Sequence, residues 1–389
     1  MYIIHLGFAG FPKGLASVQR TLFTFKGLKI AGANPIIINK ISHNYYANNY
    51  KVKRYKDIIY VNTSLLNSKP DNFIKRNLNK MSGYVGELKF LFNKRKKIDS
   101  AILYSSYFLE YPYYFLLSRI FRFKLLIQYV EMFSVIPGRN TFFTKVNDKL
   151  IDKYICSFCD GIIAISSYLE IHIKQLAPSK PLIKIPANND FEKMYTFPDL
   201  YAGNYLMYCG TIYYEEVIEF IIKIFIRLKE ENIYTGNLLL VISGDQDQNW
   251  ERLMCFVKKT AFIKDITIKS NITHDKLMQL YKAADILIIP LRNTIQDIAR
   301  FPHKIGEYTA SKRPILSTNI GELKSYFKDG ESAILVDEYS IDAYYKRLSE
   351  VLPQKDLLTE IGLEGYKIGI DNFNYKTQGV KLFEFINTL

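Results

Sequence analysis

A short segment near residue 300 holds the side chains best suited to chemistry. In Arg300-Phe-Pro-His-Lys-Ile-Gly-Glu307, Pro302 suits the first turn of a helix, and His303 and Lys304 follow it directly. The free N–H groups of a helix start, together with a lysine, can hold a phosphate. Glu307 comes one turn later, where its carboxylate can accept hydrogen bonds from the hydroxyls of a ribose. The segment indicates a nucleotide site, although an exposed surface helix has the same pattern.

A second candidate is the glycine-containing stretch after the first apolar run of the chain. Gly7, Gly10 and Gly14 stand between this run and a helical pattern, where glycines let an anion approach the backbone. Arg20, about two turns into that pattern, either contacts an anion or is an ordinary surface arginine. The spacing lacks the first G-x-G of the dinucleotide fingerprint and no acidic residue ends the second strand, which disfavours a nicotinamide enzyme.

Two comparable turns occur in the second half of the chain. Gly210-Thr211 follows the apolar run Tyr205–Cys209, and Gly244-Asp245 follows Leu238–Ser243. Glycines that follow a strand in this way can border a ligand, and a plain strand-to-loop turn explains Gly244 nearly as well.

The elements around these residues alternate between strands and helices. Tyr2–Gly10, Ile36–Asn39, Ala101–Tyr104, Lys124–Val130 and Gly161–Ile165 are predicted strands, with helices over 15–30, about 107–122 and about 141–158. After a linker pattern over 186–203, a second series begins. It has strands at 205–209, 238–243, 266–268, 285–289, 314–317 and 333–336, and helices over 215–231, 249–258 and 274–283 and from about 303. This alternation predicts two doubly wound parallel sheets with a cleft between them.

We therefore expect three parts in the chain. Residues 1–190 form one Rossmann-like domain and residues 191–372 a second one. Residues 373–389 form a C-terminal helix that packs back towards the first domain.

The charge is distributed unevenly over the 389 residues. The formal net charge is +14, yet residues 1–190 carry 28 Lys+Arg against 11 Asp+Glu, whereas residues 191–389 carry 24 against 27. The excess belongs to the first half and indicates an anionic partner: nucleic acid, a membrane surface or a phosphorylated substrate. The aromatic residues are scattered through apolar runs and no nucleic-acid module is present, which disfavours nucleic acid.

A basic, apolar segment in the first half bears on that partner. The residues Phe73, Leu78, Met81, Val85, Leu88 and Leu91 recur at roughly helical spacing, and lysines and arginines surround them at 51–56, 75–76 and 94–97. This pattern suits an amphipathic helix on an anionic membrane, and equally a helix whose apolar face packs into the core. The chain starts without a secretory signal pattern, so we expect a cytoplasmic protein, peripheral on the inner face of the membrane.

The cysteines allow one further kind of chemistry. Cys156 and Cys159 form a C-x-x-C pair, but no histidine cluster lies at zinc spacing. They are more simply small core residues on a helix with Ile151 and Ile155.

Several segments, in order, resemble the retaining glycosyltransferases of the GT-B fold, specifically family 4. Phe11-Pro-Lys-Gly14 through Arg20 looks like the opening of that family, Asp160–Ser167 like its "D-x-v-i-a-i-S" strand and Ile185–Asp190 like its linker. Ala283–Leu291 and Phe301–Pro314 look like the donor-binding block, and Gly321-Glu322 and Asp329-Gly330 match the family pattern just after that block.

The chain departs from the family pattern at three places. Of the two glutamates eight positions apart, Glu307 fits the second, but Ala299 takes the place of the first and leaves Asp297 as an unproven substitute. The Arg and Lys that clamp the donor phosphates are missing after Gly210. The histidine of the first-domain cleft has no match, since strand Leu125–Val130 is followed by Glu131.

The resemblance implies that residues 1–190 are the acceptor-binding domain and residues 191–372 the sugar-nucleotide-binding domain. The enzyme would move a hexose or N-acetylhexosamine from a UDP- or GDP-sugar to a saccharide or polyprenyl-linked saccharide, with retention. The setting would be synthesis of a bacterial capsule, O-antigen or exopolysaccharide. Lys304, Glu307 and Glu131 are the predicted catalytic residues, and no metal or cofactor is required. The predicted donor-binding residues are Gly210, Thr211, Gly244, Arg292, Arg300, Phe301, Pro302 and His303, and Gly10, Gly14 and Arg20 form the phosphate or acceptor loop.

Ala299 and the missing clamp leave one alternative open. A non-catalytic GT-B subunit that binds and stabilises a partner transferase would also show these departures.

Overall fold

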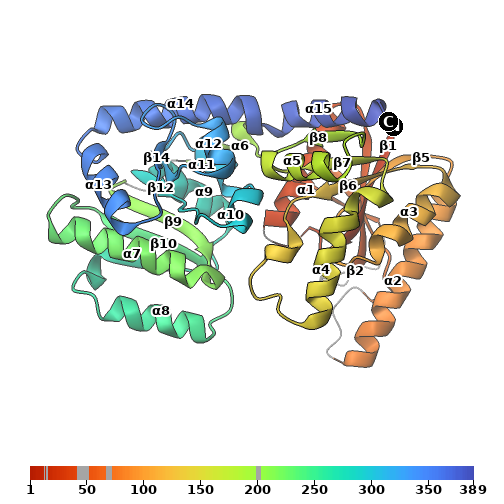
Figure 1. The fold of residues 1–389 in the computed structure, drawn as a ribbon, viewed down its shortest axis with the longest axis horizontal. Helices are drawn as coiled ribbons and strands as arrows, with labels where there is room; N and C mark the ends of the chain where they lie inside the picture. Colours follow the sequence, from red (N-terminus) through yellow and green to blue (C-terminus); the bar gives the residue numbers. More distant parts are fainter. Residues whose placement is uncertain (13, 15, 42–51, 67–71, 199–202) are drawn as a thin grey trace. The chain divides into compact units, whose positions relative to one another are not determined.

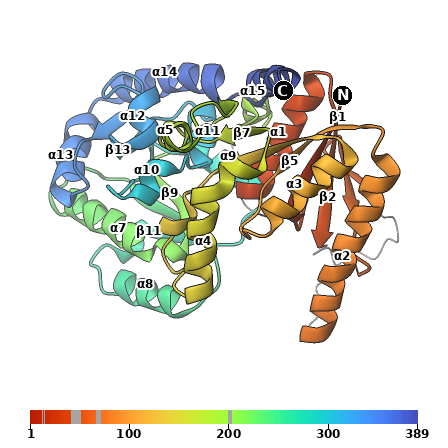
Figure 2. The same ribbon diagram turned by 45° about the vertical axis from the view of Figure 1, so that its right-hand side comes forward.

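The computed structural model describes residues 1–12, 14, 16–41, 52–66, 72–198 and 203–389. They form two compact units. Unit 1 comprises Met1–Asn188, Ala299–His303 and Tyr375–Leu389, and unit 2 comprises Asn189–Ile298 and Lys304–Asn374. Figures 1 and 2 show strands in the interior of each unit with helices around them. Part of the predicted linker, residues 199–202, and Lys51 of the basic segment lie outside the described residues.

Unit 1 is built on an eight-stranded sheet of order β3-β4-β2-β1-β5-β6-β7-β8. All neighbours are parallel except β3 and β4, which form an antiparallel pair that the sequence analysis missed. The strands are β1 (Tyr2–Ala9), β2 (Asn34–Ile41), β3 (Val52–Tyr55), β4 (Ile58–Asn62), β5 (Ile98–Leu103), β6 (Lys124–Tyr129), β7 (Gly161–Ala164) and β8 (Leu182–Lys184). The helices are α1 (Ala16–Ile30), α2 (Phe73–Lys94), α3 (Glu110–Phe121), η1 (Phe133–Val135), α4 (Phe142–Tyr154), η2 (Ile155–Phe158), α5 (Ser167–Leu176) and α15 (Tyr375–Asn387).

Unit 2 is built on a six-stranded parallel sheet of order β11-β10-β9-β12-β13-β14. The strands are β9 (Tyr205–Thr211), β10 (Asn237–Ser243), β11 (Ile266–Lys269), β12 (Ile286–Ile288), β13 (Ile315–Thr318) and β14 (Ile334–Val336). The helices are α6 (Phe191–Tyr195), η3 (Ile212–Tyr214), α7 (Glu215–Glu230), α8 (Gln248–Lys258), η4 (Ile263–Asp265), α9 (His274–Ala283), α10 (Ile295–Ala299), α11 (Lys304–Ala310), α12 (Gly321–Tyr326), α13 (Ile341–Val351) and α14 (Lys355–Phe373).

The predicted doubly wound α/β architecture is confirmed in both units. The strands are nearly continuous apolar runs because helices cover both faces of a parallel sheet. The α1 residues that recur at helical spacing, Val18, Leu22, Phe25 and Leu28, are all buried in the core of unit 1. Most predicted helix limits lie within a few residues of the observed ones, as for α3, α7 and α9.

The C-terminal helix α15 packs on α1 within unit 1 through two glycines. A Cβ on Gly27 would lie 2.2 Å from the Tyr375 carbonyl oxygen, and one on Gly379 would lie 2.2 Å from the carbonyl carbon of Gly27. Only glycine permits this approach of the two backbones.

The two cysteines of the C-x-x-C pair are buried core residues, as the simpler interpretation predicts. They lie in and just after η2, where the predicted longer helix has already ended at Tyr154. Burial raises the pKa of both thiols, that of Cys159 to about 12, which suppresses thiolate chemistry.

Candidate functional site

In unit 2, the predicted donor residues gather where the strand order reverses. From β9 the chain moves to β10 and β11 on one side, then returns as β12 on the other side of β9. In open α/β sheets, ligands bind at the carboxyl ends of the strands beside such a reversal. Gly210 and Thr211 end β9, Gly244 follows β10 and Arg292 follows β12, so all four lie at this edge.

Helix α11 brings Lys304 and Glu307 to the same edge. The Tyr308 hydroxyl accepts a hydrogen bond from the backbone N–H of Cys209 at 3.3 Å, which ties α11 to the end of β9. The Lys304 Nζ lies 5.4 Å from the centre of the Tyr208 ring. Burial raises the pKa of the Cys209 thiol, while the charge of Lys304 lowers it and that of Glu307 raises it, which places both charges near this strand end.

Glu307 has a partner that the sequence analysis missed. Its side chain is buried, and Oε1 lies 3.2 Å from Nε2 of His274, the first residue of α9. His274 is itself half-buried. The pair holds the carboxylate in one orientation at the strand edge. Nothing in the pattern around His274 indicates this contact, because the two residues are 33 positions apart in the chain.

Gly244 lies against the end of β9. It has φ +117°, and a Cβ there would lie 2.7 Å from the Ile212 side chain and 3.3 Å from Oγ1 of Thr211. Thr211 Oγ1 accepts the N–H of Tyr213 at 3.5 Å and so caps the short helix η3. The glycine therefore lets the loops after β9 and β10 approach each other closely.

Arg292 is held by carboxylates on two elements. Its Nε lies 2.9 Å from Oδ2 of Asp297, and its second guanidinium nitrogen lies 3.7 Å from Oε2 of Glu216 at the start of α7. The Asp297 carboxyl is 1% exposed and also accepts the backbone N–H of Arg292. The residue considered as a substitute for the missing family glutamate is thus part of a buried ion pair, and Ala299 is buried as well.

The predicted donor residues just before Lys304 are grouped with unit 1 rather than with unit 2. The His303 ring stacks on Phe23 of α1 with ring centres 6.2 Å apart, and the Ser166 hydroxyl donates to the carbonyl of Ala299. The sequence analysis assigned this whole segment to the second domain, whereas the division into units falls immediately before Lys304. The residues concerned are Arg300, Phe301, Pro302 and His303.

In unit 1, a cavity of about 390 Å³ lies at the corresponding reversal, where β1 has β2 and β5 as neighbours. Gly7 shapes it: the residue has φ +79°, and a Cβ would lie 2.2 Å from the carbonyl oxygen of Tyr104. The cavity is lined by Gly7, Lys40, Lys80, Tyr84, Tyr104, Ser105, Ser106, Tyr107 and Glu110. Apart from Gly7, the sequence analysis singled out none of these residues.

A buried charged cluster forms one wall of this cavity. The Lys40 ammonium pairs with Glu110, and the Tyr84 hydroxyl donates to the same carboxylate. Next to them, Glu87 is fully buried and accepts the Tyr114 hydroxyl at 2.7 Å. Burial raises the pKa of the Glu87 carboxyl to about 7, against the opposing effects of Lys40 and the Tyr114 bond.

The predicted residues Arg20 and Glu131 both act on Tyr104 of the cavity. The Arg20 guanidinium lies 5.2 Å from the centre of the Tyr104 ring. Burial raises the pKa of the Tyr104 hydroxyl, Arg20 lowers it and Glu131 raises it. Burial and, to a smaller extent, the charge of Arg20 lower the pKa of His5 to about 3. Unit 1 therefore brings an arginine, a glutamate and a phenol together at the carboxyl ends of β1, β5 and β6.

The glycine loop after β1 is fixed by an asparagine that sequence reasoning missed. Asn39, buried at the end of β2, accepts the backbone N–H of Phe11 at 3.2 Å and donates to its carbonyl at 2.7 Å. Gly10 is buried with φ +87°, whereas Gly14 is exposed. The loop is thus anchored at Phe11, and only its first glycine lies inside the fold.

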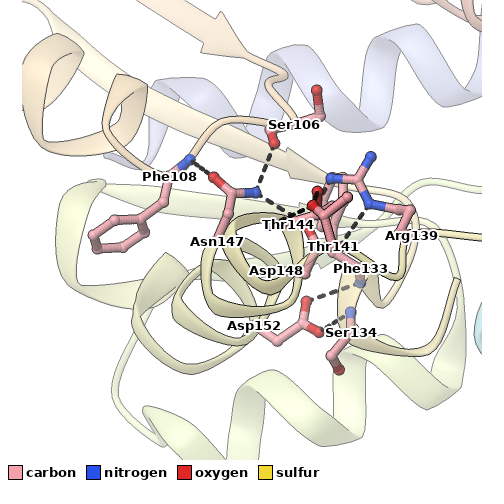
Figure 3. A network of polar contacts seen from close by, with 10 residues as sticks. All are labelled: Ser106, Phe108, Phe133, Ser134, Arg139, Thr141, Thr144, Asn147, Asp148 and Asp152. Carbon is pink, nitrogen blue, oxygen red and sulfur yellow. Dashed lines mark hydrogen bonds and ion pairs between the residues drawn. The ribbon is translucent and has the colours of Figure 1, made fainter.

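Polar residues of α4 position the segment that lines the cavity (Figure 3). Asn147 accepts the N–H of Phe108 at 2.8 Å and donates to the carbonyl of Ser106 at 2.9 Å. Asp148 binds both Nε and a terminal nitrogen of Arg139 at 2.6 Å. One turn further along, Asp152 accepts the N–H groups of residues 133 and 134. One face of α4 therefore fixes two loops of unit 1, one after β5 and one between β6 and α4.

Comparison with known proteins identifies the architecture. The chain resembles a sucrose-phosphate synthase of Thermosynechococcus elongatus with a TM-score of 0.75 and 15% identity, over 100% of this chain and 98% of that chain. It also resembles HepE of Anabaena in complex with UDP, with a TM-score of 0.69 and 13% identity over 100% of both chains. A glycosyltransferase of Rickettsia africae is similar as well, with a TM-score of 0.66 and 17% identity, over 100% of this chain and 97% of that chain.

The fold is GT-B. Residues 201–368 match the family model described as glycosyl transferases group 1, a segment that contains Gly210, Gly244, Arg292, Lys304 and Glu307. No curated protein sequence matches the chain significantly. The solved structures show the GT-B fold, and the family model supports a glycosyltransferase and hence sugar transfer.

Proposed function

We propose that this GT-B protein is a retaining glycosyltransferase of family 4. It transfers a hexosyl or N-acetylhexosaminyl group from a nucleotide sugar to a saccharide or lipid-linked saccharide during synthesis of a bacterial surface polysaccharide. One observation carries the proposal. Lys304 and Glu307 lie within the segment matched to glycosyl transferases group 1, at the strand edge where an α/β sheet binds its ligand.

The donor half of the reaction follows from the charges at this edge. Negative charge develops on the phosphate oxygen as the bond from the sugar to the diphosphate breaks. A cation fixed beside that oxygen stabilises the transition state more than the ground state. Lys304 supplies the cation, and Glu307, oriented by His274, accepts hydrogen bonds from donor hydroxyls. Arg292, held between Asp297 and Glu216, adds positive charge at the neighbouring strand end.

The acceptor half is assigned to unit 1. Its cavity of about 390 Å³ presents three tyrosines and the Lys40–Glu110 pair, groups that stack on sugar rings and hydrogen-bond to hydroxyls. The attacking acceptor oxygen forms a bond to the anomeric carbon on the face from which the diphosphate leaves. The departing phosphate oxygen takes the acceptor proton, and Glu131 orients the acceptor without being protonated.

UDP-sugars are the first donors to test. Solved HepE structures contain UDP, glucose and UDP-glucose, and a TarM structure of S. aureus contains UDP and alpha-GlcNAc-glycerol. These proteins support the choice of donor class through their shared fold. The proposed reaction requires neither a metal ion nor an organic cofactor.

The decisive experiment measures nucleotide release from a panel of UDP- and GDP-sugars, with and without polyprenyl-linked saccharide acceptors. We expect acceptor-dependent release from one donor, and an α-linked product from an α-linked donor by NMR of the anomeric proton. A product of inverted configuration would contradict the retaining assignment. Donor binding without release over the whole panel would contradict the enzyme assignment.

One observation favours a second candidate function, a non-catalytic subunit that stabilises a partner transferase. Asp297 is neutralised by Arg292 and Ala299 is buried, so neither restores the first family glutamate. Calorimetry with the same sugar nucleotides separates the two. A subunit without catalytic function would bind no donor, or bind one without turnover in the presence of every acceptor.

A further inference from the structure

Helix α2 is packed on unit 1 with its polar face inward. Its buried residues are Asn79, Gly83, Glu87 and Leu91, which recur every four positions along one side. Two glycines bring this side close to the sheet. A Cβ on Gly83 would lie 2.1 Å from the Lys40 carbonyl oxygen, and one on Gly86 would lie 2.1 Å from that of Thr63.

The apolar side of α2 is consequently in contact with solvent. Six large apolar side chains along the helix are between 52% and 71% exposed. From Ile74 their spacing of three, four or seven residues keeps them on one side of the helix. They are Phe73, Ile74, Leu78, Met81, Val85 and Phe92.

Helix α4 likewise buries polar residues and exposes large apolar side chains. Its polar residues Asn147, Asp148 and Asp152 face the unit and hold the loops drawn in Figure 3, while Phe142 and Phe143 at its start are 76% and 82% exposed. Figures 1 and 2 show α2 and α4 starting at the same end of unit 1. The first residues of both helices are therefore exposed aromatic and aliphatic side chains at one end of unit 1, and we call this set the helix-start surface: Phe73, Ile74, Phe142 and Phe143.

The exposed charges along α2 and α4 are positive. The acidic residues of α2, α3 and α4, namely Glu87, Glu110, Asp148 and Asp152, are all buried. Apart from the half-buried Arg76, the basic residues on α2 and α4 and just after α2 are exposed: Lys75, Lys80, Lys89, Lys94, Arg95, Lys96, Lys97, Lys145, Lys149 and Lys153. Burial of the carboxylates leaves a surface that is more basic than the composition indicates.

This exposure of large apolar side chains is concentrated in unit 1. Of the 27 large apolar side chains exposed in the described part of the chain, 22 belong to unit 1 and five to unit 2. A surface that combines large apolar side chains with lysines matches the interface of an anionic bilayer, where apolar groups enter below the head groups and lysines meet the phosphates. A contact between two copies through this surface would place lysines against lysines, which opposes self-association.

We propose that the helix-start surface binds an anionic lipid bilayer. Phe73 and Ile74 of α2 and Phe142 and Phe143 of α4 enter the bilayer interface, and Lys75, Lys145 and Lys149 contact the lipid phosphates. No described helix is long and apolar enough to cross a membrane, so the contact is with one surface. The binding requires no nucleotide sugar or saccharide and is therefore testable independently of the transferase activity.

The test is flotation of the full chain with vesicles of phosphatidylcholine alone or mixed with phosphatidylglycerol, in the absence of sugar substrates. We expect flotation with the anionic vesicles only, and release at high salt. The double substitution Phe142→Ser and Phe143→Ser reduces binding by about tenfold or more because it removes two inserted rings. The double substitution Lys145→Glu and Lys149→Glu also reduces binding to the anionic vesicles. Like the unsubstituted chain, this variant does not bind the neutral vesicles.

Matched controls come from unit 2. Ile263→Ser with Leu363→Ser changes two apolar side chains that are each 41% exposed, and Lys258→Glu with Lys264→Glu reverses two exposed charges. Both controls should float like the unsubstituted chain, and circular dichroism should show every variant folded. Equal flotation of the Phe142/Phe143 variant and the unsubstituted chain would overturn the proposal. A dimer in sedimentation that this variant dissociates, with no vesicle binding, would overturn it too.

Discussion

The two units share one architecture and present opposite surfaces. Helix α7 of unit 2 buries its apolar residues, among them Val217, Ile218 and Phe225, and keeps Glu219 and Lys223 towards solvent. Helix α2 of unit 1 has an equally regular apolar stripe but buries the polar side instead. A hydrophobic pattern at helical spacing thus determines that a helix is amphipathic, but not which side the protein covers. Which side is buried depends on the groups of the sheet against which the helix packs.

The side chains that lie beneath the two candidate sites also differ in polarity between the units. In unit 2, the aromatic pair Tyr281–Tyr308 supports α11 below Lys304 and Glu307. In unit 1, the corresponding position holds ionisable groups: Lys40, Glu110 and Glu87. The donor side of the proposed reaction therefore rests on an uncharged support, and the acceptor side on a charged one.

The largest expected effect tests the charged interior of unit 1. Lys40→Met leaves the Glu110 carboxylate buried without its ammonium partner, which should lower the free energy of unfolding by about 4 kcal/mol. Urea denaturation measures this loss. The exposed pair of Lys174 and Glu170 is the control, and Lys174→Met should cost under about 1 kcal/mol. Similar losses in the free energy of unfolding of the two variants would show that the Lys40–Glu110 pair stabilises the fold no more than an exposed ion pair does.

The next prediction addresses the donor edge of unit 2. Lys304→Ala should lower kcat by on the order of a hundredfold, because one preorganised charge beside the leaving phosphate is lost. Steady-state nucleotide release provides the measurement, and stability should change little since Lys304 starts its helix. Lys324→Ala, at an exposed position of α12 in the same unit, is the matched control and should leave kcat unchanged. An unaltered kcat in the Lys304 variant would remove this residue from the mechanism.

A pH dependence is expected from Glu87. Its carboxyl has a raised pKa of about 7 in the folded chain against 4.5 for the free group, so the folded state holds a proton that the unfolded state releases between these values. The free energy of unfolding therefore falls as pH rises through this window. Glu87→Gln should remove that fall and stabilise the protein by about 2 kcal/mol at pH 8 and hardly at all at pH 5.

Urea denaturation at the two pH values tests this directly. Glu170→Gln, at a partly exposed position of α5 for which no such dependence is expected, is the control. A Glu87 variant that is less stable than the unsubstituted chain at both pH values would show that the ionised carboxylate is needed in the fold.

The smallest effect concerns the loop that lines the unit 1 cavity. Asn147→Ala removes the hydrogen bonds to Phe108 and Ser106 and should raise the KM for the acceptor by about tenfold with little change in kcat, because the loop loses its fixed position. Asn372→Ala, which removes a bond within α14 of unit 2, is the control. A fall in kcat at unchanged acceptor KM would contradict the acceptor assignment of this cavity.

The sequence predicted part of the site because its signals are local. Gly210, Gly244, Arg292, Lys304 and Glu307 each follow a strand or start a helix, and such positions can be recognised from neighbouring residues alone. The structure places all five at the carboxyl edge of the unit 2 sheet. Their roles in donor binding remain predictions.

Other parts of the site had no local signal. Lys40, Glu110 and Tyr84 come from three elements and meet only because β2, α3 and α2 are neighbours in the fold. His274 and Glu307 are likewise far apart in the chain. The association of the segment before Lys304 with unit 1 was also missed, because a continuous motif gives no sign that its two ends contact different units.

The sequence by itself determined the two series of alternating strands and helices, the basic excess of the first half and the amphipathic character of α2, since each depends on residue type and spacing. Only the tertiary structure decided which side of α2 is buried. Gly83 and Gly86 let that helix approach the carbonyl groups of Lys40 and Thr63, and the same side carries Glu87 towards the buried lysine. Close backbone packing and burial of paired charges thus outweighed the hydrophobic pattern, and the apolar side was left in solvent.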